Sequence, residues 1–370
     1  MKILLLGGTG AMGVPLADML SQNGCEVYIT SRSDRRSAIE NVKFIKGNAK
    51  DDLYLKSILR GAKFDAIVDF MHYRPNELQS RLNVLLNSTD HYFFLSSSRV
   101  YASSPTPLKE ESSRLLDVVR DEEYLQTDEY ALSKARCENI IKESGYTNWT
   151  IIRPYITYFT DRLQLSVFEK ETWLFRALQG RSIVFSKDLA SKQTMLTSGK
   201  DVANVIGKLI LGRKGFSETL HPVNCEPMTW GEILNIYCDV IEDTTGKRPK
   251  VIMLEDASSY IKMVGNTYKY RYDRLADRIF DSSKVNEVLG ESVSYVPTKE
   301  GLEQAIKEFI ASGAKFKPVN LKLDVLLNRY SKEASNLRDY PGLKQKVKYL
   351  ICRFTPYLSY KQKKQGNLWW

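Results

Sequence analysis

The chain has 370 residues, of which 43% are hydrophobic, enough to bury a sizeable core in one large or two moderate domains. The apolar run at 3–6 is too short for an export signal, and no stretch approaches the ~20 apolar residues of a membrane-spanning helix. Five scattered cysteines without a CxxC pair and three widely spaced histidines disfavour a disulfide framework and a metal centre. We therefore expect a cytoplasmic protein that binds no metal.

The net charge of +10 is distributed unevenly along the chain. Residues 315–370 hold 13 of the 54 basic residues and 3 of the 44 acidic ones, which leaves 41 of each sign in residues 1–314. A neutral body followed by a basic segment predicts different roles for the two parts.

The first 155 residues alternate strand-like apolar runs with helical patterns. The expected strands are 2–6, 26–30, 42–46, 66–70, 92–96 and 150–153. The expected helices are 14–22, 53–59 and 76–86. This alternation predicts an α/β fold of the Rossmann type, with a doubly wound parallel sheet covered by helices on both faces.

The regularity fades after residue 154. The patterns that follow predict a helix over 163–182, a strand end and helix over 194–213, a helix over 229–242, a strand over 251–253 and a helix over 298–312. We expect a first domain at 1–155, with a later contribution around 194–225, and a smaller, interleaved second lobe at 156–314. A Gly-, Pro- and Lys-containing linker at 312–320 would lead to a basic, helical tail at 315–370.

Glycines at 7, 10 and 13 follow the first expected strand and precede the first expected helix. This spacing allows a tight turn, close approach of the backbone to a pyrophosphate, and close packing of the helix on the strand. The helix N-terminus would then present free N–H groups to the phosphates. The alternative is a plain glycine-rich turn. The loop residues predicted to contact a dinucleotide are Gly7, Thr9, Gly10, Ala11, Met12 and Gly13.

The end of the second expected strand indicates which dinucleotide is preferred. An NAD-preferring site usually places an acidic residue there, whereas this chain has Ser31 and Arg32. Hydroxyl and guanidinium groups suit a 2′-phosphate, so the sequence predicts a preference for NADP(H), with NAD(H) as the second choice and Arg32 as the main contact. The alternative is a solvated basic loop.

Tyr130 and Lys134 lie four residues apart, and therefore on one face of a helix. A neighbouring ammonium group favours the ionised form of a tyrosine, which would make Tyr130 an acid/base group near neutral pH. The serines at 96–98, at the end of an expected strand, could hold a reacting oxygen. The alternative is a surface helix pair.

The sequence resembles the extended short-chain dehydrogenase/reductases, the NAD(P)-dependent sugar epimerase/dehydratase family. The resemblance spans about 1–314 and leaves out the basic tail. It rests on "GGTGAMG" (7–13), "SSSRVY" (96–101), "YALSKARCE" (130–138), "IIRP" (151–154), "KDVA" (200–203) and "DSSKVNEVLG" (281–290).

The resemblance implies an NAD(P)-dependent oxidoreductase or epimerase acting on a nucleotide-activated sugar bound in a discontinuous second lobe. It implies a catalytic role for Tyr130, binding of the nicotinamide ribose by Lys134, and a catalytic Ser97, which lies four residues before Tyr101. It also implies homodimers formed through helices that include the one bearing Tyr130. The further cofactor contacts that it implies are Asn48, Phe70, Met71 and Pro154.

Several residues depart from the family pattern. The Asp–Glu pair of the family's dehydratases is replaced by Ser98 and Arg99, which disfavours dehydration. The bulky stretch "DFMHY" (69–73) replaces a small, alanine-rich turn, and we expect His72 to be a pocket-wall or core residue and not a catalyst. The NADP-like second strand favours a reductase slightly. The alternative function is a non-catalytic dinucleotide-binding protein with a sensing role or an RNA- or partner-binding role.

Apolar residues recur at helical spacing near the C-terminus, at Leu343, Val347, Leu350, Ile351 and Phe354. Lysines and an arginine take the other faces, Lys361, Lys363 and Lys364 follow, and the chain ends with Trp369 and Trp370. This pattern predicts a peripheral contact of 343–370 with an anionic membrane surface. The alternative is a helix packed on the body or on a partner subunit. Nucleic-acid binding is disfavoured because the aromatic platform expected for single strands is missing.

Overall fold

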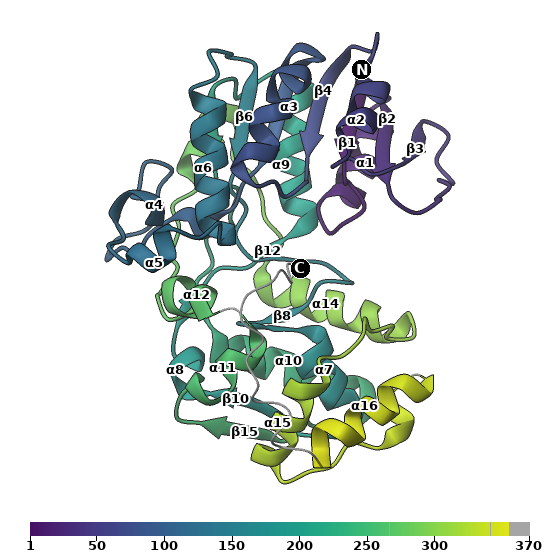
Figure 1. Ribbon diagram of the computed structural model, residues 1–370, viewed down its shortest axis with the longest axis vertical. Helices are drawn as coiled ribbons and strands as arrows, with labels where there is room; N and C mark the ends of the chain where they lie inside the picture. The colour runs from purple at the N-terminus through teal and green to yellow at the C-terminus, as the bar shows by residue number, and fades with distance from the viewer. Residues whose placement is uncertain (266, 341, 355–370) are drawn as a thin grey trace.

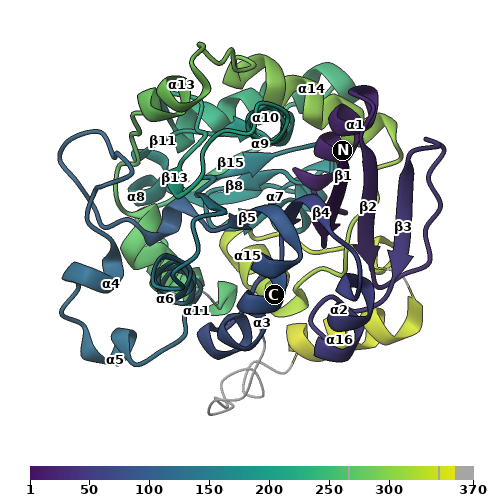
Figure 2. The ribbon, with the colours of Figure 1, turned by 90° about the horizontal axis from the view of Figure 1, so that it is seen from above.

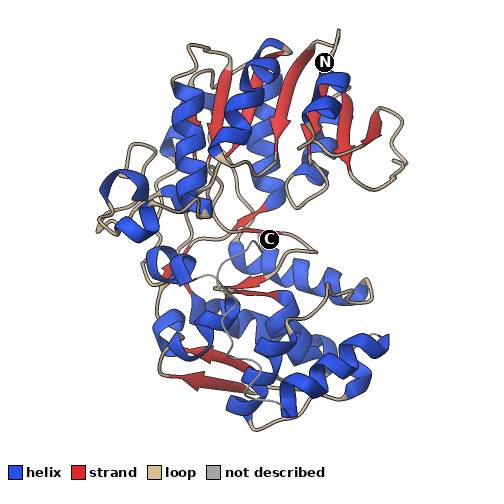
Figure 3. Cartoon of the chain, in the orientation of Figure 1, coloured by secondary structure: helices blue, strands red, loops and turns tan. Residues whose placement is uncertain are grey.

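The computed structural model describes residues 1–265, 267–340 and 342–354. The chain forms two lobes, an upper one built around a parallel sheet and a lower one that is mainly helical (Figures 1 and 3). The sheet has seven strands in the order β13-β6-β5-β4-β1-β2-β3, and every neighbouring pair is parallel. The strands are β1 (Lys2–Leu6), β2 (Glu26–Ser31), β3 (Val42–Lys46), β4 (Phe64–Asp69), β5 (Thr89–Leu95), β6 (Trp149–Ile152) and β13 (Glu218–Leu220). The predicted Rossmann-type fold is confirmed.

Helices cover both faces of the sheet, as the view from above shows (Figure 2). One face packs against α1 (Gly13–Gln22), α9 (Gly199–Leu211) and α13 (Ser283–Leu289). The other packs against α2 (Asp52–Leu59), α3 (Pro75–Asn87) and α6 (Tyr130–Lys142). The central strands are apolar on both faces because neither face meets water; residues 3–6 of β1 are completely buried.

The order of the strands determines where a ligand can bind. From β1 the sheet grows in one direction through β2 and β3 and in the other through β4, β5 and β6. In sheets of this kind, ligands bind at the carboxyl ends of the strands, at the point where the direction of growth reverses. Here that point lies between β1 and β4.

The lower lobe surrounds its own hydrophobic core. Its larger helices are α7 (Lys170–Leu178), α10 (Trp230–Thr245) and α14 (Thr298–Ala311). Its paired strands are β8 (Gln164–Leu165) with β9 (Phe168–Glu169), β10 (Ile183–Ser186) with β15 (Val251–Leu254), and β11 (Gln193–Thr194) with β14 (Met228–Thr229). β7 (Thr157–Tyr158) pairs with β12 (Thr197–Ser198) where the chain leaves the upper lobe and returns to it.

Short helical segments complete the fold. They are α4 (Leu115–Val118), α5 (Glu122–Leu125), α8 (Lys187–Ala190), α11 (Ser258–Val264) and α12 (Thr267–Lys269), the 3-10 turns Ser98–Val100 and Leu337–Asp339, and a π-helical turn at Tyr270–Arg274. Among the described residues, no helix is long and apolar enough to cross a membrane.

The helix expected over 163–182 is wrong in its first part. α7 begins only at Lys170, and the residues before it form the β8–β9 hairpin, with Ser166 in a left-handed conformation at φ 52°. In the sequence, Leu163, Leu165 and Val167 alternate with the polar residues Gln164 and Ser166, which is the period of a strand and not of a helix.

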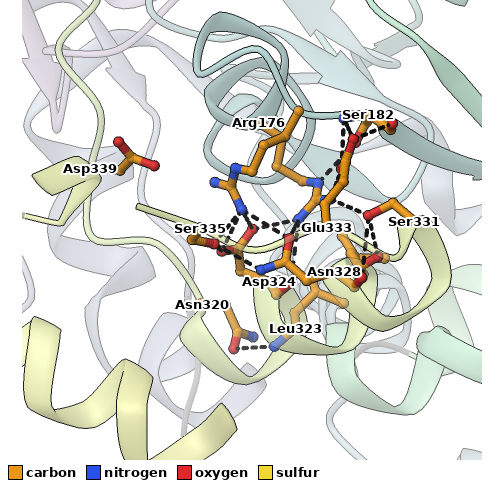
Figure 4. A network of polar contacts seen from close by, with 12 residues as sticks. Arg176, Ser182, Asn320, Leu323, Asp324, Asn328, Ser331, Glu333, Ser335 and Asp339 are labelled. Atoms are coloured by element: carbon orange, nitrogen blue, oxygen red, sulfur yellow. Dashed lines mark hydrogen bonds and ion pairs between the residues drawn. The ribbon is translucent and has the colours of Figure 1, made fainter. Parts of the chain in front are cut away.

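Two helices follow the second lobe, α15 (Leu321–Ser331) and α16 (Gly342–Phe354). Asp324 of α15 accepts hydrogen bonds from Arg176 Nη1 at 2.8 Å and from Arg181 Nη1 at 2.9 Å, in the network drawn in Figure 4. Both arginines are almost completely buried. This network fixes α15 to the lower lobe, and α16 packs on α15.

Candidate functional site

The turn after β1 has the geometry that a dinucleotide turn needs. Gly7 has a φ of 71°, which glycine adopts without strain, and its N–H donates to Thr30 Oγ1 at 2.9 Å. The N–H of Thr9 donates to the carbonyl of Gly7 at 2.9 Å, which closes the turn. A Cβ on Gly7 would lie only 2.6 Å from Met71 Sδ, so the turn and the segment after β4 are in close contact.

Close packing also explains the other glycines of this turn. A Cβ on Gly13 would lie 2.5 Å from Gly8 Cα, so α1 can begin this near the turn only with a glycine at that position. Gly199, at the start of α9, approaches the carbonyl of Ala11 so closely that no side chain fits between them. A Cβ on Gly10, by contrast, would meet nothing within 4 Å. The open space is therefore beside Gly10 and the N-terminus of α1, where a pyrophosphate would receive N–H groups.

The predicted adenosine contacts lie on the neighbouring side of the sheet. Ser31 ends β2 and is buried, whereas Arg32 directly after it is exposed. Asn48 follows β3, is exposed, and accepts a hydrogen bond from Lys50 N through its own side chain at 3.1 Å. Among the described residues, Arg32 forms no ion pair, so its guanidinium group is available to a ligand.

The three serines after β5 have different surroundings. Ser96 Oγ donates to Glu138 Oε1 at 2.5 Å, and Ser98 Oγ donates to the carbonyl of Arg153 at 2.6 Å. Ser97 Oγ accepts a hydrogen bond from Arg99 N at 3.2 Å, and within the described part of the chain it donates none. Ser97 therefore keeps a hydroxyl proton for a substrate, while its two neighbours hold the loop in place.

Pro154 belongs to the support of this loop. It is buried, and its carbonyl accepts a hydrogen bond from Ser98 N at 3.0 Å. Its predicted role as a cofactor contact stays a prediction.

Tyr130 and Lys134 stand at the start of α6, on the face that meets the carboxyl ends of β4 and β5. The Nζ of Lys134 donates to the carbonyl of Leu95 at 2.6 Å and to that of Met71 at 3.1 Å. Lys134 is 2% exposed, but an ammonium group has three protons, and these two bonds leave one. The ring of Tyr130 is half-buried and stacks on the ring of His72 at 5.2 Å between centroids.

The bulky turn after β4 forms one wall of the site. Burial raises the pKa of Asp69 to about 6, although Met71 N and Tyr92 Oη each donate a hydrogen bond to its carboxyl group at 2.9 Å. Burial, together with the ammonium group of Lys134, lowers the pKa of His72 to about 4. His72 is therefore neutral near pH 7. Its stacking on Tyr130 fits the wall position predicted for it.

Reasoning from the sequence missed Glu129 and the second-lobe partners of Arg99. The guanidinium group of Arg99 lies 5.3 Å from the centre of the Tyr130 ring and donates to Glu129 Oε1 at 2.7 Å. Arg99 Nε lies 3.8 Å from a carboxylate oxygen of Asp273, which comes from the π-helical turn of the second lobe. Thus both lobes contribute to the surroundings of Tyr130.

Asp273 is the centre of a cation-rich cluster. It pairs with Arg274 and with Arg278, whose Nε lies 3.1 Å away. Burial alone would raise the pKa of Asp273, but these guanidinium groups hold it below its ordinary value. Burial and the charge of Arg274 lower the pKa of Lys269 to about 7. The basic stretch "KYRYDRLADR" (269–278) was the signal in the sequence, but nothing in it indicated contact with a residue some 170 positions earlier.

Comparison with known families identifies the upper lobe. A sequence model of the NAD dependent epimerase/dehydratase family matches residues 3–158, which contain the glycine turn, the serine loop and the Tyr130–Lys134 pair. Over these residues the chain is similar to that family. A comparison with curated proteins found no matching sequence.

Solved structures share the epimerase/dehydratase fold over most of this chain. UDP-glucuronic acid 4-epimerase from Bacillus cereus, in complex with UDP-glucuronic acid and NAD, has a TM-score of 0.63 at 16% identity and covers 84% of this chain and 100% of its own. The Bordetella bronchiseptica enzyme WbmH, in complex with NAD+, has a TM-score of 0.62 at 16% identity, with coverage of 84% and 99%. An epimerase from Methanothermobacter thermautotrophicus has a TM-score of 0.63 at 17% identity, with coverage of 84% and 93%. At these identities the likeness shows a common fold.

Proposed function

We propose that this protein is an NAD(P)-dependent enzyme that oxidises or reduces a carbon of a nucleotide-activated sugar, either as an epimerase or as a reductase. The observation that carries the proposal is the position of Lys134. Its bonds to the carbonyls of Leu95 and Met71 bring the Tyr130–Lys134 face of α6 to the carboxyl ends of β4 and β5. Since β4 also pairs with β1, the glycine turn lies at the same edge of the sheet.

The residues at this edge fit a dinucleotide. Gly7 and Gly13 occupy positions where a Cβ would collide, and Gly10 borders open space at the N-terminus of α1. The N–H groups of this turn would hold the pyrophosphate, and the remaining proton of Lys134 would reach a ribose hydroxyl. When bound, the nicotinamide supplies the two-electron redox chemistry that no side chain can supply.

Three side chains would handle the substrate's oxygen and its proton. Tyr130 would take the proton from a sugar hydroxyl during oxidation and return it during reduction. Ser97 would hold the reacting oxygen with its unused hydroxyl proton. Arg99 and Glu129 would position Tyr130, because Glu129 accepts from both Arg99 Nη2 and the N–H of Ala131 at the start of α6.

Dehydration is not part of the proposal. Elimination of water from a sugar needs an acid/base pair beside the reacting carbon. At the two positions after Ser97 this chain has Ser98, whose hydroxyl is bonded to the carbonyl of Arg153, and Arg99, which is paired with Glu129. Neither is a group that exchanges protons near neutral pH.

The known structures do not support the preference for NADP(H), because two of the three solved structures named above hold NAD. In its favour, Arg32 is exposed and forms no ion pair among the described residues. Fluorescence titration with NADPH and NADH tests it. Tighter NADPH binding that is lost in Arg32→Ala supports the preference, and equal affinities contradict it.

Turnover is tested with UDP-glucose, UDP-glucuronic acid and UDP-N-acetylglucosamine, which relatives of this fold bind or convert according to their names. Each is incubated with the full chain and NAD(P)+ or NAD(P)H, and the products are separated by chromatography. Tyr130→Phe should reduce turnover at least ~1000-fold and leave dinucleotide binding within about threefold. Tyr330→Phe on α15, remote from the sheet, is the matched control.

Two results would contradict the proposal. If Tyr130→Phe turns over as fast as the unaltered chain, Tyr130 is not the acid/base group. If the chain binds a dinucleotide but converts no sugar nucleotide, the non-catalytic alternative with a sensing or partner-binding role takes precedence.

A further inference from the structure

Helix α16 is attached to the lower lobe by one side only. Tyr349 is 2% exposed and its ring lies 4.9 Å from that of Tyr340. Its hydroxyl accepts hydrogen bonds from Ser335 N at 3.1 Å and from Asn328 Nδ2 at 3.4 Å. Cys352, three residues further along the helix, packs on the same apolar cluster. Tyr349 and Cys352 therefore mark the inner side of α16.

The opposite side of α16 carries a stripe of exposed apolar side chains. Leu343, Val347, Leu350 and Phe354 are 77%, 46%, 37% and 71% exposed. Their spacing of four, three and four residues places them on one line along a helix that turns once every ~3.6 residues. Cys352 lies about half a turn from this line, and Tyr349 lies about a third of a turn from it. Four of the five large apolar side chains that α16 exposes are thus aligned and face away from the protein, and the fifth, Ile351, lies beside them.

Cationic side chains border this apolar stripe on both sides. Lys344 and Lys348 lie along one edge, and Lys346 and Arg353 along the other, as the helical spacing requires. The sequence of α16 contains no Asp or Glu. Among the described residues, none of these four cations forms an ion pair.

We propose that α16 binds to an anionic lipid bilayer, with its apolar stripe in the headgroup–acyl boundary and its cations against lipid phosphates. An interfacial helix combines an apolar stripe with a Lys/Arg-rich border in this way. α16 lies on the outer edge of the lower lobe, away from the parallel sheet (Figure 1). A bilayer could therefore bind it without covering the carboxyl ends of the strands. The proposal is independent of the proposed catalytic activity.

The charge of α16 favours a bilayer over a second copy of the chain. A symmetric contact through the stripe would bring two sets of four cations together without a single acidic residue from either helix. Anionic lipids supply the missing negative charge at the same place. The predicted contact also included 355–370, with Lys361, Lys363, Lys364, Trp369 and Trp370, but those residues lie outside the described ones, and α16 alone carries the proposal.

The test is flotation of the full chain with vesicles of phosphatidylcholine containing 30% phosphatidylglycerol, and with vesicles of phosphatidylcholine alone. The chain should float with the anionic vesicles and not with the neutral ones, and about 0.5 M NaCl should weaken binding. The double variant Leu343→Ser/Phe354→Ser should lower the partition coefficient by about tenfold or more. Lys344→Gln/Lys348→Gln should lower it by roughly thirtyfold.

Leu53→Ser is the matched control, because Leu53 on α2 is 80% exposed and lies in the upper lobe. It should float like the unaltered chain. Unfolding curves confirm that each variant folds, which we expect because the altered side chains are largely exposed. Failure to float with anionic vesicles, or equal flotation of Leu343→Ser/Phe354→Ser, overturns the proposal. A dimer that dissociates in that variant, without vesicle binding, would show that a second copy covers the stripe instead.

Discussion

Arg99 Nη2 donates to Glu129 Oε1 over 2.7 Å, and Glu129 in turn caps the helix whose first residue is Tyr130. The two side chains are only 13% and 10% exposed. Removing one member of a buried ion pair is costly because the other charge remains buried. We expect Arg99→Met to lower the free energy of unfolding by about 3 kcal/mol, measured by urea denaturation.

Two further variants make this prediction specific. Arg99→Met combined with Glu129→Gln should recover more than half of the loss, because the buried charge is gone. Arg248→Met, which breaks an exposed ion pair with Asp239, should cost less than about 1 kcal/mol. If Arg99→Met costs no more than Arg248→Met, the Arg99–Glu129 pair does not hold the start of α6.

The buried carboxyl group of Asp69 predicts a dependence of stability on pH. Its folded pKa of about 6 lies above the ordinary value of 3.8. The folded state therefore holds this proton more tightly, and the stability that it provides is lost as the pH rises from about 4 to 6. Above that range the ionised group costs up to about 3 kcal/mol.

Asp69→Asn removes this cost while keeping an acceptor for Tyr92 Oη. We expect the variant to be more stable than the unaltered chain at pH 8 by up to about 3 kcal/mol, and by less than about 1 kcal/mol at pH 4.5. Denaturation at both pH values measures the two differences. Asp18→Asn, on the exposed side of α1, is the control and should change little. An equal effect of Asp69→Asn at both pH values would contradict the prediction.

Neighbouring serines should respond in opposite ways to the same substitution. Ser96→Ala removes a hydrogen bond to the buried carboxylate of Glu138 and should cost about 1.5–3 kcal/mol of stability. Ser97→Ala removes a hydroxyl that donates no hydrogen bond within the described residues, so it should cost less than about 1 kcal/mol. If Ser97 holds the reacting oxygen, Ser97→Ala should still lower turnover of the nucleotide sugar about 100-fold. A Ser97→Ala enzyme with full turnover would remove this serine from the proposed site.

The attachment of α15 gives a fourth prediction. Asp324 is 2% exposed and pairs with both Arg176 and Arg181. Asp324→Ala leaves two buried guanidinium groups without their carboxylate and should cost about 3–5 kcal/mol in urea denaturation. Asp243→Ala, at an exposed position of α10, should cost less than about 0.5 kcal/mol. Equal losses in the two variants would mean that the network does not fix α15.

The sequence predicted the sheet well because its strands are continuous buried apolar runs. The bounds expected for β1 and β3 match the structure, and those expected for β2, β4, β5 and β6 differ by up to three residues. The short edge strand β13 was not predicted. The hairpin before α7 was missed because Leu163–Phe168 is apolar enough to pass for a helix when its period of two is ignored. Local apolar patterns therefore predicted most strands and helices. The hairpin was mispredicted because its apolar residues fit both the helical period of about 3.6 and the strand period of two.

Ion pairs between residues far apart in the sequence could not be predicted. In the basic segment 315–370, Asp324 and Glu333 are two of the three acidic residues, and they bind arginines 143–157 positions earlier. The motifs located Tyr130, Lys134 and Ser97, but the Arg99–Asp273 contact joins two lobes through side chains that no motif connects. Charge counts along the chain cannot show which charges are already paired.

The interleaving of the two lobes constrains how the protein is made. β13 (Glu218–Leu220), the last strand of the sheet, pairs with β6 (Trp149–Ile152), but residues 157–198 of the lower lobe are synthesised between them. During translation β1 to β6 therefore emerge from the ribosome first, before β13 pairs with β6 and before α9 covers its face of the sheet. Exposed strand edges are sites of misassociation. Until residue 220 has been synthesised, the edge of β6 that β13 later covers has no partner strand.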